Sequence, residues 1–319
     1  MLLFSLDPHC TFAATLATAL DETLAPHEDR SFVDGEHKTR SLVDPRGADA
    51  YVLCSLHGGP VDSPNDKLVG LLMFAASLRD HGAARVTAVV PYLAYARKDR
   101  RTQPWDPVSL RYVAQMFEAV GIEQVIVLEA HNVAAFENAF RCTTLHLPIH
   151  SVFEEAVRGL VAEAPVAVAS PDPGGVKRAQ LWRESLQDRW ARPVGFAMVD
   201  KRRSEGLVSG GSLVAGDVRE MTVLLFDDLI ASGETLRRAA LALRHAGARQ
   251  VIGCAGHGLF IEPASQVLAD PALQHILVTD SVPSFRVPAL GPLHGKLRIV
   301  TCVPLLAQAI RDCRDAWAR

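Results

Sequence analysis

MTVLLFDDLIASGETLRRAALALRHAG, residues 221–247, passes from an apolar run through two acids and a small-residue turn into an amphipathic pattern. The run from Met221 to Phe226 has no polar face, so it predicts a strand buried on both sides in a parallel sheet. Gly247 is a typical helix stop. Between the turn and that glycine, apolar residues recur at helical spacing: Leu236, Ala239, Ala240 and Leu243. We therefore expect a strand, a tight turn and a helix.

Polar and small residues fill the turn between this strand and this helix. Asp227 and Asp228 follow the strand, and Ser232, Gly233 and Thr235 lead into the helix. A small-residue turn at a helix N-terminus offers free backbone N–H groups and the positive end of the helix dipole, which together bind phosphate. The paired acids suit ribose hydroxyls. An ordinary turn with a solvent-facing acid pair fits the same residues equally well.

The composition limits the class of protein. With 319 residues, 49% of them hydrophobic, the chain can bury large cores, and its length favours two domains. The formal net charge of −3 gives no overall attraction to nucleic acid or anionic membranes, so any anion site must be local. The six cysteines have no metal-ligand spacing, which is typical of reduced residues in a cytoplasmic protein. There is neither a run of 18 apolar residues nor a basic leader, so we expect no membrane span and no export.

One pattern recurs along the chain: a helix, a glycine, a short connection and a buried strand. It predicts strands at Val86–Val90, Gln124–Leu128 and Gln250–Cys254. A helix that leads into a buried strand is half of a βαβ unit, and the pattern occurs in both halves of the chain. We therefore expect an α/β fold of two similar doubly wound domains with parallel sheets.

Local patterns predict the remaining elements. Around Asp34-Gly35, the segment FVDGEHKTR alternates polar and apolar residues about a turn signal, which predicts a surface hairpin. The other predicted elements are strands at 2–5, 50–55, Val166–Ala169 and Gly195–Val199, and helices at Thr11–Leu24, Asn65–His81 and Pro304–Trp317.

Charged loops follow several predicted strands, where open α/β sheets bind ligands. Arg97 and Lys98 begin a run of four cations in five residues. His131 follows the next strand, and Asp172 lies at the tip of the tight loop SPDPGG. After Val199, a basic segment rich in glycine and serine has too few apolar anchors to be rigid, which predicts a mobile flap. Each feature also has a purely structural interpretation: a solvated cation cluster, a packed histidine, a helix cap and a surface loop.

Several of these stretches resemble one enzyme family. DDLIASGET is similar to the phosphoribosyl-pyrophosphate (PRPP) loop of phosphoribosyltransferases and, more closely, of ribose-phosphate pyrophosphokinases. PYLAYARKDR resembles the family form PYFGYARQDR, and SPDPGGVKRA resembles SPDAGGVKRA. Five such blocks follow the family's order between Phe32 and Ile310. The chain is therefore identified as a divergent member of the ribose-phosphate pyrophosphokinase family, with a type I phosphoribosyltransferase-like fold.

The resemblance implies how the chain binds ATP and a metal. In the family, the hairpin contributes an aromatic ring and two acids to adenine recognition, often in a neighbouring subunit's site. The implied ATP-binding residues are Phe32, Asp34, Glu36, Arg97, Lys98 and His131. His131 and Asp172 are implied to hold Mg²⁺, the expected cofactor.

The resemblance likewise implies a sugar-phosphate site and two catalytic cations. The implied ribose 5-phosphate residues are Asp227, Asp228, Ser232, Gly233, Glu234 and Thr235. Lys201 and Arg203 of the basic flap match the family's D-K-R-R loop, in which cations neutralise the developing phosphoryl charge. The implied domains are an ATP-side domain at 1–150, joined by the C-terminal helix 303–319, and a phosphoribosyltransferase-like domain for ribose 5-phosphate at 151–302.

Four residues depart from the family pattern. Lys98 replaces Gln, Glu129 replaces Asp, Ala231 stands where Asp or Gln is usual, and Glu234 stands where Gly is usual. A left-handed backbone at Glu234 would cost about 1 kcal/mol or more, and its carboxylate would have to turn away from a bound phosphate. The segment TQPWDP replaces a more basic one, which weakens the expectation of regulation by phosphate and ADP.

The sequence therefore predicts a ribose-phosphate diphosphokinase, which transfers the β,γ-diphosphoryl group of ATP to the 1-hydroxyl of ribose 5-phosphate and gives PRPP and AMP. Its expected partners are ATP and ribose 5-phosphate in a homo-oligomer, a dimer or a hexamer, with no nucleic acid and no membrane. Two alternatives remain open: a catalytically silent paralogue that regulates such enzymes, and a phosphoribosyltransferase. The loop departures favour the silent paralogue, whereas the retained flap cations and metal-side residues favour an enzyme.

Overall fold

Apolar runs in the first half of the chain form a parallel sheet. The computed structural model describes residues 1–7, 11–161, 163–200 and 213–317. The chain divides into two compact units: the first comprises Met1–Pro148 and Val303–Arg319, and the second comprises Ile149–Cys302. The strands of the first unit's sheet pair in parallel throughout. Their order is β1 (Leu2–Ser5), β4 (Asp49–Leu53), β5 (Arg85–Val90), β6 (Gln124–Leu128) and β7 (Thr143–Leu147).

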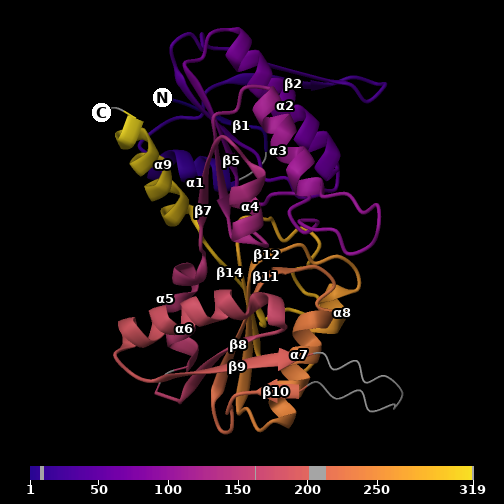
Figure 1. Cartoon of the computed structure of the whole chain (residues 1–319), viewed down its shortest axis with the longest axis vertical. Coiled ribbons are helices and arrows are strands. Elements are labelled where there is room, and N and C mark those ends of the chain that lie inside the picture. The colour runs from indigo at the N-terminus through magenta and orange to yellow at the C-terminus, as the bar shows by residue number, and fades with distance from the viewer. Residues whose placement is uncertain (8–10, 162, 201–212, 318–319) are drawn as a thin grey trace. The chain divides into compact units, whose positions relative to one another are not determined.

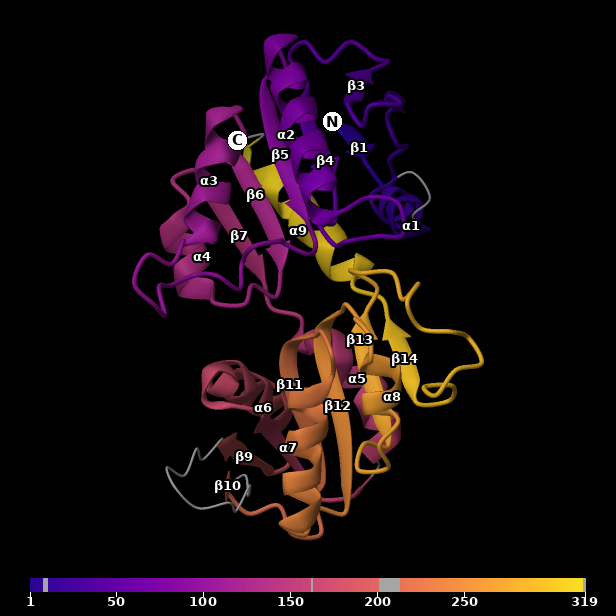
Figure 2. The ribbon, with the colours of Figure 1, turned by 90° about the vertical axis from the view of Figure 1, so that its right-hand side faces the viewer.

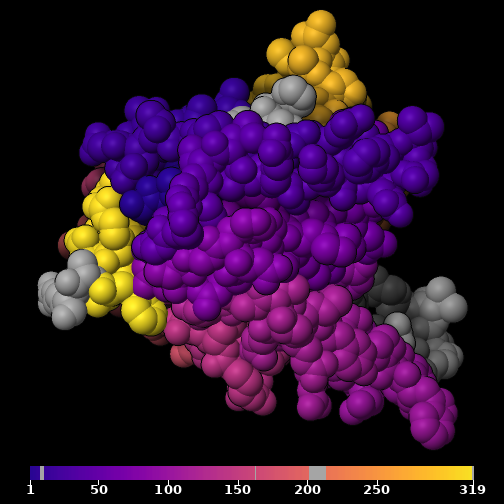
Figure 3. All heavy atoms as spheres, turned by 90° about the horizontal axis from the view of Figure 1, so that it is seen from above, coloured from indigo at the N-terminus to yellow at the C-terminus, as the bar shows by residue number. Residues whose placement is uncertain are grey.

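Helices cover both faces of this sheet, which is why β5 and β6 are buried at every position. One face carries α2 (Pro64–Asp80), α3 (Ser109–Ala119) and α4 (Val133–Ala139), and the other carries α1 (Thr11–Ala19) and α9 (Val303–Trp317) (Figures 1 and 2). The C-terminal helix α9 packs beside α1, and Arg311 Nη1 donates to Ala19 O at 2.6 Å. Figure 3 shows α9, in yellow, against the surface of the first half of the chain.

A β-hairpin precedes β4, as the sequence predicts. Strands β2 (His27–Ser31) and β3 (His37–Ser41) pair antiparallel, and the hairpin projects from the unit (Figure 1). Phe32 N donates to Glu36 O at 2.7 Å, and Gly35 N donates to Phe32 O at 3.0 Å, which closes the turn. Gly35 has a φ of 92°, a left-handed conformation that glycine adopts without strain.

The second unit is built around a seven-stranded sheet. Every neighbouring pair of strands is parallel except β10 with β9. The order is β10 (Leu213–Ala215), β9 (Val194–Asp200), β8 (Val166–Ser170), β11 (Thr222–Ile230), β12 (Gln250–Gly258), β13 (His275–Thr279) and β14 (Leu297–Val300). The chain adds β9 on one side of β8 and β11 on the other, so the strand order reverses there. Open α/β sheets bind ligands at the carboxyl ends of strands beside such a reversal.

Helices cover both faces of the second sheet as well. On one face lie α5 (His150–Val161) and α6 (Val176–Trp190), and on the other lie α7 (Glu234–His245) and α8 (Ala264–Leu268) (Figure 1). The apolar face of α7 is buried, as its spacing predicts: Leu236, Ala239, Ala240 and Leu243. The α/β fold of parallel sheets and alternating helices is thus confirmed. No helix in the described ranges is long and apolar enough to cross a membrane.

One predicted helix is too long. The helix expected over Thr11–Leu24 ends at Ala19. Asp21 takes a left-handed conformation with a φ of 55°, and Leu24 forms an isolated parallel bridge with Leu3. The chain therefore leaves the helix early, because a contact with β1 stabilises an extended conformation that helical periodicity does not reveal.

One predicted strand is too short. The strand expected at Met221–Phe226 continues through Asp227 and Asp228 to Ile230. The reason is β12, which also extends beyond its predicted end and pairs alongside, with Leu229 opposite His257. The two acids therefore lie within β11 and not after it.

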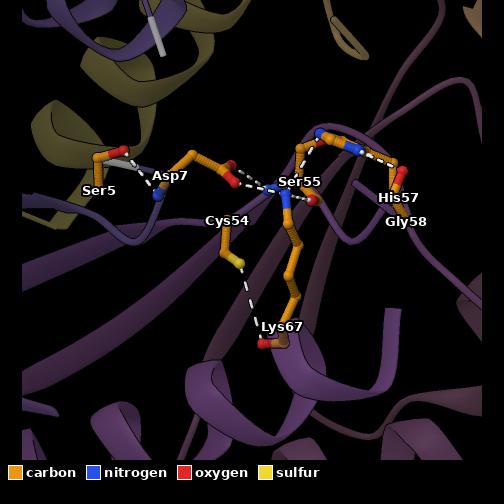
Figure 4. Close-up of polar contacts among 7 residues, drawn as sticks. All are labelled: Ser5, Asp7, Cys54, Ser55, His57, Gly58 and Lys67. Atoms are coloured by element: carbon orange, nitrogen blue, oxygen red, sulfur yellow. Dashed lines mark hydrogen bonds and ion pairs between the residues drawn. The ribbon is translucent and has the colours of Figure 1, made fainter. Parts of the chain in front are cut away.

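A lysine joins β1, β4 and α2 at the carboxyl edge of the first sheet (Figure 4). Lys67 Nζ donates to Asp7 Oδ1 at 2.6 Å, Ser55 O at 3.2 Å and His57 Nε2 at 3.3 Å, which uses all three ammonium protons. Asp7 Oδ2 accepts from Ser55 N at 3.0 Å. Because His57 Nδ1 donates to Gly58 O at 3.2 Å, the neutral imidazole presents Nε2 to the lysine. The Lys67 and Asp7 side chains are only 10% and 14% exposed, so the ion pair is largely shielded from water.

The replacement Lys67→Met is expected to lower the free energy of unfolding of the first unit by about 3–5 kcal/mol, because it leaves the Asp7 carboxylate buried without its cation. Hydrogen exchange of the β1 and β4 amides measures this loss. The double replacement Asp7→Asn, Lys67→Met removes both charges and should recover most of it. Lys38→Met is the matched control, because Lys38 pairs with Glu28 at an exposed site, where ion pairs contribute about 1 kcal/mol or less. Equal effects of the two lysine replacements would contradict the prediction.

Candidate active site

Two of the predicted ATP-side residues lie on neighbouring loops of the first unit. Arg97 follows β5 and His131 follows β6, and both are exposed. Asn132 Nδ2 donates to Asp99 Oδ2 at 2.7 Å, which ties the two loops together. The structure thus brings Arg97 and His131 to the same edge of the first sheet.

Both loops contain strained backbone. Tyr95 and Glu129 adopt left-handed conformations, with φ of 64° and 40°. Such conformations are costly for residues with a Cβ, so the surrounding structure must hold them in place. Tyr95 donates its hydroxyl proton to Asn65 Oδ1, and Glu129 N donates to Leu147 O at 3.0 Å. Residues held in this way concentrate at functional sites, which supports a site at this edge.

Lys98 is engaged by Asp106. Its Nζ donates to Asp106 Oδ2 at 2.6 Å and to Thr102 Oγ1 at 3.3 Å. The same Asp106 oxygen also accepts from Thr102 N at 2.9 Å and Gln103 N at 3.0 Å. These hydrogen bonds, with that from Lys98 the largest contribution, hold the pKa of Asp106 well below its ordinary value. The network uses two of the three ammonium protons of Lys98.

The predicted adenine-side residues lie at the tip of the β2–β3 hairpin. Phe32, Asp34 and Glu36 are all exposed. The Arg30 guanidinium lies 5.1 Å from the Phe32 ring centroid, and Asp34 Oδ1 accepts from Glu36 N at 3.2 Å. Within the described ranges, no hydrogen bond, ion pair or ring contact joins these three side chains to the loops that carry Arg97 and His131.

Asp172 caps a short helix in the second unit. It precedes a turn of 3₁₀ helix, Pro173–Gly175, and its Oδ1 accepts from Gly174 N at 2.9 Å and Gly175 N at 3.2 Å. A Cβ on Gly175 would lie 2.7 Å from Ser170 Oγ, so glycine is required for the loop to fold this closely over β8. The capping interpretation of Asp172 is thus correct for one carboxylate oxygen.

Burial and mutual repulsion disfavour ionisation of the acid pair in β11. Asp228 is buried, and Asp227 Oδ1 accepts from Asp228 N at 2.9 Å. Burial, and then the charge of Asp228, raise the pKa of Asp227 well above its ordinary value. Arg178 Nη1 lies 3.8 Å from Asp228 Oδ1 and offsets part of this effect. Arg178 lies in the first turn of α6, after Val176 and Lys177, and is not among the predicted site residues.

The small-residue turn opens helix α7 with a glycine. Gly233 is the N-cap residue with a φ of 78°, and a Cβ there would lie 2.6 Å from Leu268 Cγ, so only glycine fits. The left-handed position is thus Gly233, and Glu234 is the first residue of the helix. Because the N-cap residue has no side chain, it leaves the N–H groups of the first turn available to an anion. Ser232 and Thr235 flank this turn and are half-buried.

The acids of the second unit fit a divalent ion that shares its coordination with a substrate. In the part of the chain that the structure describes, no group of three His, Cys, Asp or Glu side chains is arranged to hold a metal. Mg²⁺ usually takes one or two carboxylates and fills its other positions with water and substrate oxygens. Asp172, Asp227 and Asp228 supply such carboxylates at the carboxyl ends of β8 and β11. The predicted catalytic cations, Lys201 and Arg203, lie outside the described residues.

Family models match both units. Residues 1–121 match the N-terminal domain of ribose phosphate pyrophosphokinase. Residues 149–264 match the phosphoribosyl transferase domain. The parallel sheet, the acid pair and the glycine turn of the second unit therefore belong to a phosphoribosyltransferase-type domain.

Whole-chain relatives narrow this class to one family. The ribose-phosphate pyrophosphokinase of Helicobacter hepaticus is 32% identical over 97% of this chain and 94% of its own length. That of Aquifex aeolicus is 34% identical over 89% of this chain and 86% of its own length. The crystal structure of phosphoribosylpyrophosphate synthetase from Mycobacterium smegmatis matches with a TM-score of 0.86 and 30% identity, and the match covers 99% of both chains. The chain belongs to the ribose-phosphate pyrophosphokinase family.

The raised pKa of Asp227 predicts the pH dependence of stability. Above the ordinary carboxyl value of 3.8, the folded chain keeps a proton on this pair that the unfolded chain loses. The free energy of unfolding of the second unit therefore falls as pH rises from 3.8 through the raised pKa. Asp227→Asn is expected to flatten this slope and to unfold at a higher temperature than the wild type at the alkaline end, in metal-free buffer without substrate.

Calorimetric melts of the second unit across this pH range measure the effect. Asp217→Asn is the matched control, because Asp217 is an exposed acid of the same unit whose pKa is lowered by hydrogen bonds from Arg219. Its replacement should not flatten the slope. A wild-type slope that survives Asp227→Asn unchanged would show that other groups control the pH dependence.

Proposed function

We propose that this chain transfers the β,γ-diphosphoryl group of ATP to the 1-hydroxyl of ribose 5-phosphate and releases AMP and PRPP. The observation that carries the proposal is the match to named ribose-phosphate pyrophosphokinases over nearly the whole chain. The arrangement of side chains supports it, because each unit has polar and small residues at the carboxyl edge of its sheet. In this proposal the first unit binds ATP and the second binds ribose 5-phosphate.

The second unit provides the sugar-phosphate site. Backbone N–H groups between Ser232 and Thr235, at the positive end of α7, hold the 5-phosphate. Asp227 and Asp228 accept hydrogen bonds from ribose hydroxyls. The raised pKa of Asp227 supports this role, because a buried carboxyl group with a surplus of nearby negative charge is stabilised when hydroxyl donors or a cation reach it.

The first unit provides the ATP side. Arg97 and His131 lie on neighbouring loops that the Asn132–Asp99 hydrogen bond connects, and they contact the triphosphate together with Lys98. Phe32, Asp34 and Glu36 recognise adenine in the site of a second copy of the chain. The exposure of all three side chains at the hairpin tip supports this shared site and hence a homo-oligomer.

Diphosphoryl transfer needs positioning and charge neutralisation and does not require a covalent nucleophile. The ribose 1-oxygen bonds to the β-phosphorus, the bond from that phosphorus to the α,β-bridging oxygen breaks, and the hydroxyl proton leaves to solvent. His131 in the first unit and Asp172 in the second are the proposed Mg²⁺ ligands, and the ion would supply screening of the phosphate charge. Lys201 and Arg203 of the basic segment neutralise charge at the β-phosphorus, a role that the family motif supports.

A catalytically silent regulatory paralogue is the second candidate. The observation that favours it is the Asp106 network, because Asp106 neutralises the Lys98 ammonium charge and takes one of its three protons. Ala231 favours it too, because its methyl group cannot replace the polar side chain that is usual there. A phosphoribosyltransferase is the third candidate, but it does not account for the match of the first unit to the N-terminal domain of a pyrophosphokinase.

A ³¹P NMR time course with Mg–ATP and ribose 5-phosphate tests the proposal. We expect AMP and a sugar-linked diphosphate to form together, and we expect the Lys201→Ala variant to lose this turnover by at least about a hundredfold, the usual effect of removing one group that stabilises transition-state charge. Unchanged ATP in the wild-type sample would favour the silent paralogue. Turnover that survives Lys201→Ala would contradict the assigned role of the basic segment.

A further inference from the structure

Glu234 places a negative charge at the first position of α7, beside the N–H groups that the proposed sugar-phosphate site uses. Its carboxylate does not point back to those groups. Glu234 Oε2 accepts from Arg237 Nε at 3.3 Å and from Arg237 Nη2 at 3.1 Å, one helical turn further along. The Glu234 side chain is 53% exposed, so it lies on the solvent side of the helix.

Arg237 is itself anchored from a second direction. Its Nη1 lies 3.7 Å from Asp270 Oδ2, and the other oxygen of Asp270 accepts from Ala272 N at 2.9 Å. Lys296 Nζ donates to the backbone oxygens of Ala269 and Asp270 at 2.7 and 2.8 Å, which fixes the segment after α8. The Arg237 guanidinium therefore bridges one acid on a fixed loop and one acid on its own helix.

The same segment supports the glycine turn. Leu268, at the end of α8, packs against Gly233 so closely that a Cβ there would clash. Residues 268–270 thus contact the glycine turn through Leu268 and Arg237 through Asp270. One short segment therefore holds both the glycine turn and the Arg237 guanidinium in place.

A glutamate without this partner would behave differently. The positive end of a helix attracts carboxylates in its first turn, and the free N–H groups there donate hydrogen bonds to them as they do to phosphate. A carboxylate in that position would compete with a bound phosphate and repel it. Ion pairs three residues apart on an exposed helix contribute little to folding stability, so the effect of Arg237 should be sought in binding.

We propose that Arg237 is a positioning residue for sugar-phosphate binding: it holds the Glu234 carboxylate on the outer side of α7 and keeps the anion site at the helix N-terminus clear. This inference rests on the proposed function, because it takes the α7 turn as the site of the 5-phosphate. It explains how the chain carries an acid at a position where its family usually has glycine. Asp270 is the second anchor, since it contacts Arg237 Nη1 while Glu234 contacts Nε and Nη2.

The dissociation constant of ribose 5-phosphate, measured by isothermal titration calorimetry, tests this role. Arg237→Gln is expected to weaken binding about fivefold, the effect of one misplaced charge at a helix N-terminus. Glu234→Gln should bind at least as tightly as the wild type. The double variant Glu234→Gln, Arg237→Gln should bind as Glu234→Gln does, because no carboxylate remains to be positioned. Arg249→Gln is the matched control, since it removes one positive charge from an exposed site beyond the far end of α7 and should bind as the wild type does.

Recovery of binding in the double variant separates a positioning role of Arg237 from a structural one. If Arg237 only stabilised the fold, removal of Glu234 would not restore binding, and a double variant as weak as Arg237→Gln would overturn the inference. An Arg237→Gln variant that binds as tightly as the wild type would overturn it as well. Binding without turnover in the wild-type chain would instead overturn only the proposed activity. A wild-type chain that binds no ribose 5-phosphate would overturn the sugar-phosphate site and the inference together.

Discussion

Strands β11 and β12 pair in parallel as far as Ile230 and Gly258. The candidate site of the second unit depends on this pairing, because it places the adjacent carboxylates of Asp227 and Asp228 inside a sheet. One of them is buried, the pKa of the other is raised, and Arg178 compensates only part of the charge. The strand also ends directly before the glycine turn, so the same pairing fixes where the helix N-terminus begins. The Asp227 and Asp228 carboxyl groups and the N–H groups of the first turn of α7 are thus in place before any ligand binds. Sites that stabilise charge require this preorganisation.

Patterns confined to one segment could be predicted from the sequence. The β2–β3 hairpin follows from the Asp34-Gly35 turn signal, and α7 follows from its apolar spacing, because both signals lie within the element that they specify. The fold class also follows, since buried parallel strands between helices leave continuous apolar runs. Family likeness then indicates which turns carry phosphate chemistry.

Features that depend on a distant partner could not be predicted. The end of β11 depends on how far β12 accompanies it, and the end of α1 depends on a bridge between Leu24 and Leu3. The ion pair of Lys67 with Asp7 joins a residue in α2 to one that follows β1, 60 residues earlier, and neither residue has a local signal. At the candidate site, the sequence indicates the presence of Lys98 and Glu234 but not their partners, Asp106 and Arg237, which decide where each charge lies.

The C-terminal helix gives the first unit a discontinuous sequence. Leu306, Ile310 and Cys313 of α9 are buried, and Gln124 Nε2 donates to Cys313 Sγ at 3.2 Å, so a strand near the middle of the chain is completed by its last helix. During synthesis on a ribosome, residues 1–148 emerge while one face of their sheet still lacks this cover, and the whole second unit emerges before α9 does. Domains generally fold as units once their sequence is available. The first unit can therefore be completed only after the whole second unit has been translated.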